Sequence, residues 1–519
     1  MEFYFDYGKI KTRIYTKKYK SKYVDFFVNI DNVKEMCLYV SNFKSTQYSL
    51  ECIRKENKFD EIRLHRISKA ANIYYVSLPW QTDDIKFYLK YIDCSDNENK
   101  STNIEEINNL GFFETAIPWN ESVYYIIVDR YCDINEKEKL DDEDYYAGGT
   151  FSAIYDDLER IRNAGYSIVY LSPIMESLGY HGYNQLSLFD ISAKIGGDKD
   201  LLRLVNGIKS VGMKLGLELV LNHISVFSEE FKKAIRHESD LITIGMNADY
   251  VRYRDNTDLV KIEYTFKNKE EILKKITELI DKYNVGFIRL DSCDYINNFF
   301  VNRLMECCIN RNVIVIGECW NNYSNFFNNY KVNGATNYKL FGLVKQLYVD
   351  KNISVSEFEK QLVLMIYEHG LLKNNYMLNF IDNHDVSRVS NFVNSIKELL
   401  NMLSFVYIYL GIPMIYYGTE NYSDNIIEIS ANRRGFSLDI NKQIEDCINK
   451  LNKLRKEFVD DIVGFETEKD ILCIRRKIRS GYIKYIYNNS NFNVNYMGEC
   501  ICGYESIIIK NGERIDFNG

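Results

Sequence analysis

The feature that most constrains the fold is an alternation of strand-like and helix-like segments from Trp119 to about residue 454. Eight short apolar segments are typical of buried strands. They are ESVYYIIVDR (121–130), YSIVYLSP (166–173), KLGLELVLN (214–222), GFIRLD (286–291), NVIVIGE (312–318), GATNY (334–338), YMLNFIDN (376–383) and GIPMIYYG (411–418). Helical periodicity separates them, as in the run that places Phe151, Ile154 and Leu158 on one face. The pattern predicts a (β/α)8 TIM barrel, although a doubly wound sheet shares the same alternation.

Short strand-like runs flank this region on both sides. Residues 1–116 contain YVDFFVNI, NIYYVSLPW and similar runs between polar turns, which predict an N-terminal β-sandwich, here interpreted as a module of the carbohydrate-binding type. The runs ILCIRRK, YIKYIYNN and SIIIKNG predict a C-terminal β domain over residues 459–519. The catalytic barrel is expected over 117–458, with a short excursion after its third strand at about 224–263.

The composition excludes some partners. A formal charge of -8 argues against nucleic acid and anionic membrane surfaces, and favours a neutral substrate. The charged start MEFYFDYGKIKTRIY lacks the apolar core of a secretory signal, and no run of about 18 apolar residues is present. We therefore expect a cytoplasmic protein. Its 12 cysteines lack paired zinc-ligand spacing and are expected to be free thiols.

Polar side chains follow the predicted strands where functional groups of a barrel are expected. In GFIRLD, Arg289 and Asp291 share one face of an apolar strand, a pattern that by itself also suits a structural ion pair. The other strand ends carry polar groups too. These are Asn222 and His223 after the third strand, Glu318 after the fifth, and Asn383, His384 and Asp385 after the seventh, while His181 lies in the loop after the second. Together these groups favour an active site at this rim.

Two chemistries suit such a rim. A metal site would use His223, His384 and carboxylates, but no HxH or HExxH spacing places two imidazoles on one element. Glycosidic bond cleavage needs one ionised carboxylate and one protonated carboxyl. Arg289 would keep Asp291 ionised, whereas Glu318 follows an apolar strand that would raise the pKa of its carboxyl.

Four segments carry a resemblance to a known family. GLELVLNH, GFIRLDSCDYI, VIGECW and FIDNHDVSR resemble, in this order, the four signature regions of the α-amylase family, glycoside hydrolase family 13. GYSIVYLSPIMES with YHGYN, GATNY, and GIPMIYYGTE with NRRGFSLD extend the likeness over roughly residues 119–454. The entry WNESVYYIIVDRY after a β domain is similar to the neopullulanase, cyclomaltodextrinase and maltogenic amylase group.

The resemblance implies a role for each matching residue. Asp291 would be the nucleophile, Glu318 the general acid/base and Asp385 the carboxylate that helps hold the distorted sugar. The implied substrate-binding residues are Tyr183, which would stack beneath the −1 glucose, with His181, His223, Arg289, His384, Asn383 and Arg388. The implied activity is retaining cleavage of α-1,4 bonds in maltodextrins, cyclodextrins or pullulan, with α-1,6 cleavage and glycosyl transfer left open. No cofactor is required for this chemistry.

Several positions depart from the family pattern. Glu218 stands where an aspartate is usual, one methylene longer, and we expect it near Arg289. Calcium is left open near Asp133, Asn135 and the run Asp141 to Asp144, where Gly149 and Thr150 replace the usual Gly-Asp. A catalytically silent relative that binds glycans or a partner through its β domains is the alternative. The resemblance also suggests a homodimer formed through the N-terminal domain.

Overall fold

The computed structural model describes most of the chain, and the statements below concern that part. Described are residues 2–5, 8–16, 22–30, 33–41, 52–56, 59–63, 65–68, 73–80, 85–93, 95, 98–100, 105–107, 120–132, 146–245, 249–254, 256–265, 267–370, 376–422, 433 and 440–515. Contacts divide the chain into two compact units. The first comprises Met1–Ile117, Ile353–Asn375 and Ile462–Arg475, and the second comprises Pro118–Asn352, Tyr376–Asp461 and Arg476–Gly519. The division into three domains at residues 116 and 458 stays a prediction.

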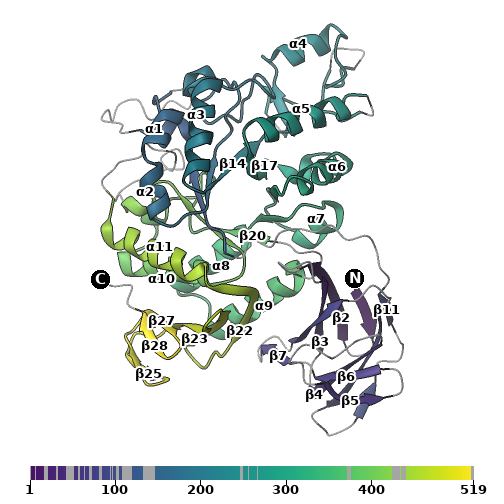
Figure 1. Ribbon diagram of the computed structural model, residues 1–519, viewed down its shortest axis with the longest axis vertical. Coiled ribbons are helices and arrows are strands. Elements are labelled where there is room, and N and C mark those ends of the chain that lie inside the picture. The colour runs from purple at the N-terminus through teal and green to yellow at the C-terminus, as the bar shows by residue number, and fades with distance from the viewer. Residues whose placement is uncertain are drawn as a thin grey trace. The chain divides into compact units, whose positions relative to one another are not determined.

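The second unit contains a closed barrel of eight parallel strands (Figure 1). In order around the barrel these are β12 (Val123–Ile126), β13 (Ile168–Leu171), β14 (Lys214–Leu219), β17 (Val285–Leu290), β18 (Ile314–Gly317), β19 (Gly334–Thr336), β20 (Tyr376–Asn379) and β21 (Ile412–Tyr416). Pairing of β12 with β21 closes the ring. The predicted barrel and all eight strand positions are confirmed, and the doubly wound alternative is wrong.

Helices follow the barrel strands, and one further short helix lies in the excursion after the third strand. In the second unit they are α1 (Phe151–Asp156), α2 (Leu158–Asn163), α3 (Gly197–Ser210), α4 (Glu229–Ile235), α5 (Lys269–Lys282), α6 (Asn298–Ile309), α7 (Tyr323–Asn329), α8 (Tyr338–Tyr348), α10 (Ile396–Ile408) and α11 (Lys442–Arg455). The single helix predicted from Phe151 is divided into two helices, because α1 ends before Asp157 and α2 begins after it. Ser395 caps α10 by accepting from the backbone N–H of Glu398. None of the described helices is long and apolar enough to cross a bilayer.

Tyrosine rings fill the inside of the barrel. The Tyr125 ring stacks on Tyr170 with centroids 4.4 Å apart and on Tyr416 at 5.2 Å. Gly216 of β14 makes room for them, because a Cβ there would lie 3.1 Å from the Tyr170 backbone and 2.9 Å from the Phe287 ring. The inside of the barrel is thus a packed core.

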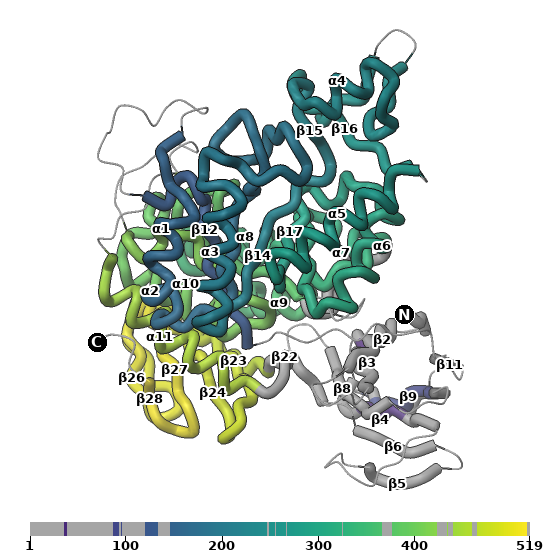
Figure 2. Tube along the Cα trace, turned by 45° about the horizontal axis from the view of Figure 1, so that its top comes forward, coloured from purple at the N-terminus to yellow at the C-terminus, as the bar shows by residue number. Residues whose placement is uncertain are grey.

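The excursion after the third strand is a small folded element. The short strand β15 (His223–Ser225) pairs antiparallel with β16 (Leu259–Lys261), and α4 lies between them in the chain. The predicted third strand reached Asn222, whereas β14 ends at Leu219 and His223 opens β15. In both ribbon and tube views, the excursion lies at the opposite end of the unit from β27 (Ser506–Lys510) (Figures 1 and 2).

The β-rich segments predicted at both ends of the chain are present. The first unit has two antiparallel sheets, in the orders β1-β2-β3-β8-β7 and β10-β9-β4-β6-β5. Their strands are β1 (Glu2–Phe5), β2 (Gly8–Thr16), β3 (Lys22–Ile30), β4 (Val33–Ser41), β5 (Cys52–Glu56), β6 (Phe59–Arg63), β7 (His65–Ser68), β8 (Ile73–Trp80), β9 (Ile85–Asp93) and β10 (Glu98–Lys100), with β11 (Glu105–Ile107) beside β9. Helix α9 (Val355–Gly370) belongs to this unit.

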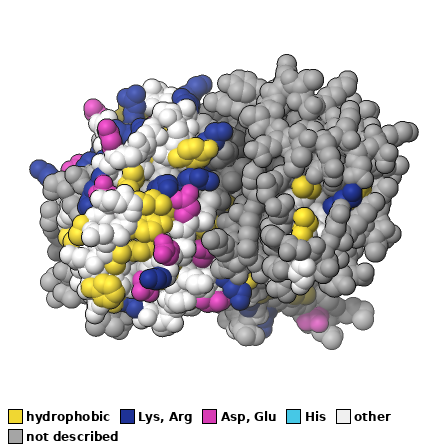
Figure 3. All heavy atoms as spheres, turned by 90° about the horizontal axis from the view of Figure 1, so that it is seen from below, with side chains coloured by type: hydrophobic (Ala, Val, Ile, Leu, Met, Phe, Trp, Pro, Cys, Tyr) yellow, Lys and Arg dark blue, Asp and Glu magenta, His cyan; other side chains and the backbone are white. Residues whose placement is uncertain are grey.

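The C-terminal strands form a five-stranded sheet in the order β22-β23-β24-β27-β28, with a separate hairpin. They are β22 (Phe458–Phe465), β23 (Ile471–Ile478), β24 (Gly481–Asn488), β27 (Ser506–Lys510) and β28 (Glu513–Ile515), and the hairpin strands are β25 (Val494–Tyr496) and β26 (Glu499–Ile501). Seen from below, hydrophobic and charged side chains are interspersed on the described face (Figure 3). Tyr482, Phe492 and Met497 are exposed large hydrophobic residues of this region.

Candidate active site

Two carboxylates lie side by side at one end of the barrel because neighbouring strands end in register. Leu290 of β17 pairs with Gly317 of β18, and Asp291 and Glu318 are the next residues of each strand. The backbone N–H of Glu318 donates to the Leu290 carbonyl at 2.9 Å, which continues the ladder. Both residues are buried, and each is 7% exposed. The structure thus brings these two acids together at the rim.

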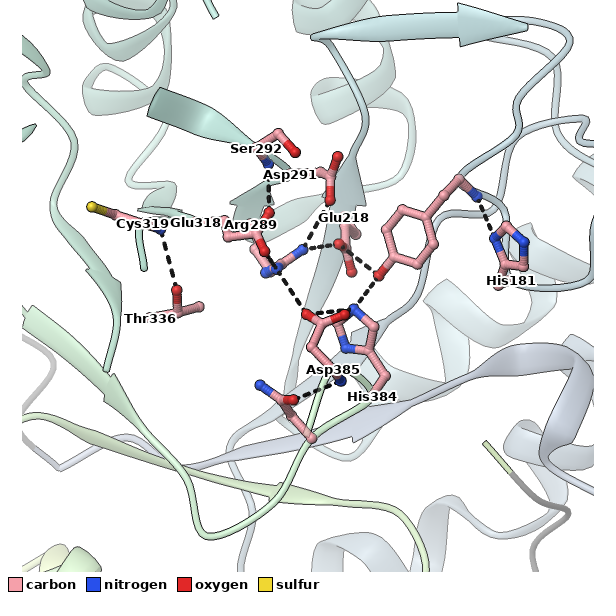
Figure 4. A network of polar contacts seen from close by, with 12 residues as sticks. His181, Glu218, Arg289, Asp291, Ser292, Glu318, Cys319, Thr336, His384 and Asp385 are labelled. Carbon is pink, nitrogen blue, oxygen red and sulfur yellow. Dashed lines mark hydrogen bonds and ion pairs between the residues drawn. The ribbon is translucent and has the colours of Figure 1, made fainter. Parts of the chain in front are cut away.

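Arg289 stands at the centre of a four-carboxylate cluster (Figure 4). Its Nη1 binds Glu218 and lies 3.5 Å from Asp291 Oδ1, while its Nη2 lies 3.1 Å from Glu318 Oε1 and 3.8 Å from Asp385 Oδ2. The guanidinium is buried, and its planar fork can address several oxygens at once. A single cation therefore organises carboxylates from β14, β17, β18 and the loop after β20.

Glu218 is fully satisfied in its buried position. Its carboxylate accepts from Arg289 Nη1, from the Tyr170 hydroxyl and, at 3.0 Å, from the Tyr183 hydroxyl. Burial raises the pKa of Glu218 to about 6, while Arg289 acts in the opposite direction. The expected closeness of Glu218 and Arg289 is confirmed, and the extra methylene is accommodated by two tyrosine donors.

The environments of Asp291 and Glu318 differ from the sequence expectation. Burial, with the negative charge of Glu318, raises the pKa of Asp291 well above its ordinary value, although Arg289 lowers it. Glu318 is held by polar donors: Ser292 N–H donates to Oε2 at 2.6 Å, and Trp320 Nε1 donates to Oε1 at 3.0 Å. Arg289 thus favours ionised Asp291, as the sequence predicts, but burial has the larger effect on this pKa.

An aromatic wall lines the other side of the site. The Tyr183 ring stacks on His384 with centroids 5.5 Å apart and an interplanar angle of 11°, and on His181 at 5.5 Å and 23°. His384 Nε2 lies 2.6 Å from the Tyr183 hydroxyl and 3.1 Å from Asp385 Oδ2. Burial lowers the pKa of His384 well below its ordinary value and that of His181 to about 3. Both imidazoles are therefore neutral near pH 7.

Three other predicted residues contact backbone groups of the loops at this end of the barrel. His223 is 2% exposed, and its Nε2 lies 3.1 Å from the Tyr183 carbonyl oxygen. The side-chain Oδ1 of Asn383 accepts from the backbone N–H of Asp385 at 2.8 Å, which fixes the turn that carries this carboxylate. Arg388 Nη1 donates to the Tyr417 carbonyl at 2.6 Å and lies 3.8 Å from Asp382. Their contact with a substrate stays a prediction.

Sequence reasoning missed several residues that contact this cluster. Tyr338 donates to Asp385 Oδ2 at 3.0 Å and stacks on Trp320 with centroids 3.7 Å apart. Arg433 Nε donates to the His384 carbonyl at 3.2 Å. Trp320, Tyr338 and Ser292 lie within three residues of the ends of strands β18, β19 and β17, so proximity to a strand end was a usable signal. Tyr253 also contributes, and no pattern in the sequence pointed to it.

No metal centre is evident in the part of the chain that the structure describes. There, no group of three or more His, Cys, Asp or Glu side chains is arranged to hold an ion. His223 and His384 point to Tyr183 and Asp385 instead. The residues considered for calcium, Asp133, Asn135 and Asp141 to Asp144, lie outside the described residues.

Comparison with known proteins agrees with this geometry. The family model described as "Alpha amylase, catalytic domain" matches residues 125–269 and 246–491. "Alpha-amylase 2" of Schwanniomyces occidentalis is 26% identical over 336 residues, covering 59% of this chain and 65% of that protein. "Intracellular maltogenic amylase" of Bacillus subtilis (strain 168) is 25% identical over 342 residues, covering 59% and 56%. The alignments thus span less than two thirds of either relative.

Solved structures show the same fold. A maltogenic amylase from S. marinus superposes with a TM-score of 0.78 at 18% identity, covering 95% of this chain and 80% of that one. The type III pullulan hydrolase from Thermococcus kodakarensis gives a TM-score of 0.76 at 17% identity, covering 96% and 98%. Because the family match extends over well more than half of the 519 residues, the chain belongs to the α-amylase family.

Proposed function

We propose that this protein is a retaining α-glucan hydrolase that cleaves α-1,4-glucosidic bonds. The observation that carries the proposal is the pair of Asp291 and Glu318, which follow register-paired residues of adjacent strands. Neighbouring strands are about 4.8 Å apart. This spacing suits the carboxyl separation of about 5 Å found in retaining enzymes better than the wider gap of inverting ones.

The two carboxyls have complementary roles in this proposal. Asp291 attacks the anomeric carbon while Glu318 gives its proton to the glycosidic oxygen, so that the C1–O bond breaks and a β-glucosyl ester forms on Asp291. Glu318, now ionised, takes a proton from water, whose oxygen attacks the same carbon and frees Asp291. Trp320 Nε1 and the Ser292 N–H hold the Glu318 carboxyl in place for these proton transfers.

The remaining rim residues suit a neutral sugar. The Tyr183 ring offers an apolar face of the kind on which a pyranose stacks, and His384 and Asp385 offer hydrogen bonds to hydroxyls. Arg289 stabilises the negative charge on Asp291 as the ester breaks. The proposal includes retention of the anomeric configuration. It also includes binding of the sugar at the −1 position by His181, His223 and Arg388.

The test is product analysis on maltoheptaose, β-cyclodextrin, pullulan and starch. We expect reducing sugar from the wild type and a loss of at least about a thousandfold in Asp291→Asn and Glu318→Gln, with an unchanged fold by circular dichroism. Asp281→Asn, an exposed carboxylate of α5 bound by Arg311, is the matched control and should keep full activity. Full activity in either site variant would refute the proposal. Glucan binding without turnover by the wild type would support the silent relative instead.

Location and assembly are part of the same proposal. We expect the protein in the cytoplasm, in line with its similarity to the intracellular maltogenic amylase of Bacillus subtilis. The homodimer through the N-terminal domain is tested by the mass of the active species in solution. A fully active monomer at working concentration would contradict it.

A further inference from the structure

The excursion after the third strand reaches the site through Tyr253. The Tyr253 ring stacks on His223 with centroids 4.3 Å apart and an angle of 18°, and its hydroxyl lies 2.6 Å from Ser292 Oγ. The backbone at this point is held, since the Tyr253 N–H donates to the Leu259 carbonyl at 3.0 Å. Tyr253 is therefore a fixed contact between the excursion and the residue that follows Asp291.

Ser292 occupies an unusual backbone position. Its φ and ψ angles of 47° and 43° are left-handed, a conformation that costs a non-glycine residue free energy. From this turn the Ser292 N–H points at Glu318 and donates to Oε2 at 2.6 Å. A residue in a costly conformation at such a place needs support from its surroundings, and the Tyr253 hydroxyl provides it.

The two oxygens of Glu318 are held from different directions. Oε1 accepts from Trp320 Nε1 and lies 3.1 Å from Arg289 Nη2, both of which belong to the barrel. Oε2 is held by Ser292, whose hydroxyl is bound from the excursion. The orientation of the carboxyl therefore depends on contacts from the excursion as well as from the barrel.

We propose that Tyr253 is a positioning residue for Glu318: its hydroxyl holds Ser292 in the turn from which the Ser292 N–H orients the acid. The inference rests on the proposed function for its catalytic meaning, since it concerns the acid/base of that reaction. The excursion then serves the chemistry of the site, because it fixes the proton donor through a hydrogen-bonded chain of two residues.

Several charged and titratable groups lie near Glu318 and affect the titration of its carboxyl. They are Glu218, His223, Tyr253, Arg254, Arg289, Asp291, Cys293, Asp294, Cys319, Tyr338 and His384, with Asp385 joined through Arg289. Removing one neutral hydroxyl leaves all the charges in place. Tyr253→Phe therefore isolates the hydrogen-bond chain.

The direct test is a titration of the Glu318 carboxyl carbon by NMR in the full-length protein, with the signal assigned by its loss in Glu318→Gln. Tyr253→Phe keeps the ring on His223 and removes the hydroxyl, so the N–H bond that favours ionised Glu318 weakens. We expect the Glu318 titration to move up by about half a pH unit. Ser292→Ala should give the same shift, and the double variant no further one. Tyr250→Phe, whose ring contacts Phe231 in the same excursion, is the matched control.

An unchanged titration in Tyr253→Phe would overturn the inference, as would shifts that add in the double variant. Because the titration needs no turnover, it decides the inference even if the wild type cleaves no α-glucan, in which case only the proposed function fails. With an active wild type, the basic limb of kcat/KM on maltoheptaose should move up by the same amount. A lower rate with unmoved limbs would show a merely structural role for Tyr253.

Discussion

Glu218 and Arg289 form a buried ion pair between directly paired residues of strands β14 and β17. Their side chains are 0% and 3% exposed. The Glu218 carboxylate also accepts hydrogen bonds from the hydroxyls of Tyr170 and Tyr183, so the pair is fully hydrogen-bonded. This arrangement turns the second nitrogen of the guanidinium toward Glu318 and Asp385. Glu218 thus fixes the position of Arg289, which contacts the other three carboxylates of the site.

Shortening or neutralising Glu218 should lower activity. Glu218→Asp loses reach to at least one of its three donors, and we expect kcat/KM to fall by about tenfold. Glu218→Gln leaves Arg289 to pair more tightly with Asp291 and Glu318, and we expect a fall of about a hundredfold. Initial rates on maltoheptaose measure both, with the exposed Glu271→Asp of α5 as control. A wild-type rate in Glu218→Asp would show that the extra methylene has no function.

The pH profile should show the raised pKa of Asp291. Burial and the charge of Glu318 raise this pKa, and the reaction needs Asp291 ionised, so activity is lost as the pH falls through the raised value. We expect the acid limb of kcat/KM to lie above the pKa of about 3.9 that is ordinary for an aspartate. An acid limb below about pH 4 would contradict the burial argument.

His223 should make the protein less stable in acid. Burial lowers its pKa to about 4 in the folded state, while the unfolded chain binds a proton near pH 6.5. The unfolded state then binds more protons, so stability falls as the pH drops from about 6.5 to 4, by up to about 3 kcal/mol. His223→Gln should remove this part of the pH dependence of the unfolding free energy in urea. Identical pH dependence in the two proteins would refute the assignment, and the exposed His237→Asn is the control.

The barrel and its carboxylates could be predicted because both depend on local sequence. Each predicted strand is a short apolar run, and Asp291 and Glu318 follow directly after such runs, so strand pairing alone brings them together. The break between α1 and α2 at Asp157 and the end of β14 at Leu219 were missed. The second miss has a clear cause: the chain leaves the barrel there to pair β15 with β16.

What could not be predicted depends on contacts between distant residues. The hydrogen bond between the Tyr253 and Ser292 hydroxyls joins residues 39 positions apart in the chain, and no spacing rule predicts it. The pKa of Asp291 was misjudged for a similar reason. Arg289 is its neighbour in sequence, but burial is produced by the packing of the whole rim and has the larger effect.

The most direct measurement is to trap the covalent intermediate that the proposed mechanism requires. Glu318→Gln should be incubated with an activated 5-fluoro-α-glucosyl fluoride, whose fluoride leaves without acid assistance, and then analysed by intact mass and peptide mapping. We predict a gain of one fluoroglucosyl group, located on the peptide that contains Asp291, and no gain in Asp291→Asn. A label on another residue, or reagent turnover that gives the inverted sugar without any label, would contradict it.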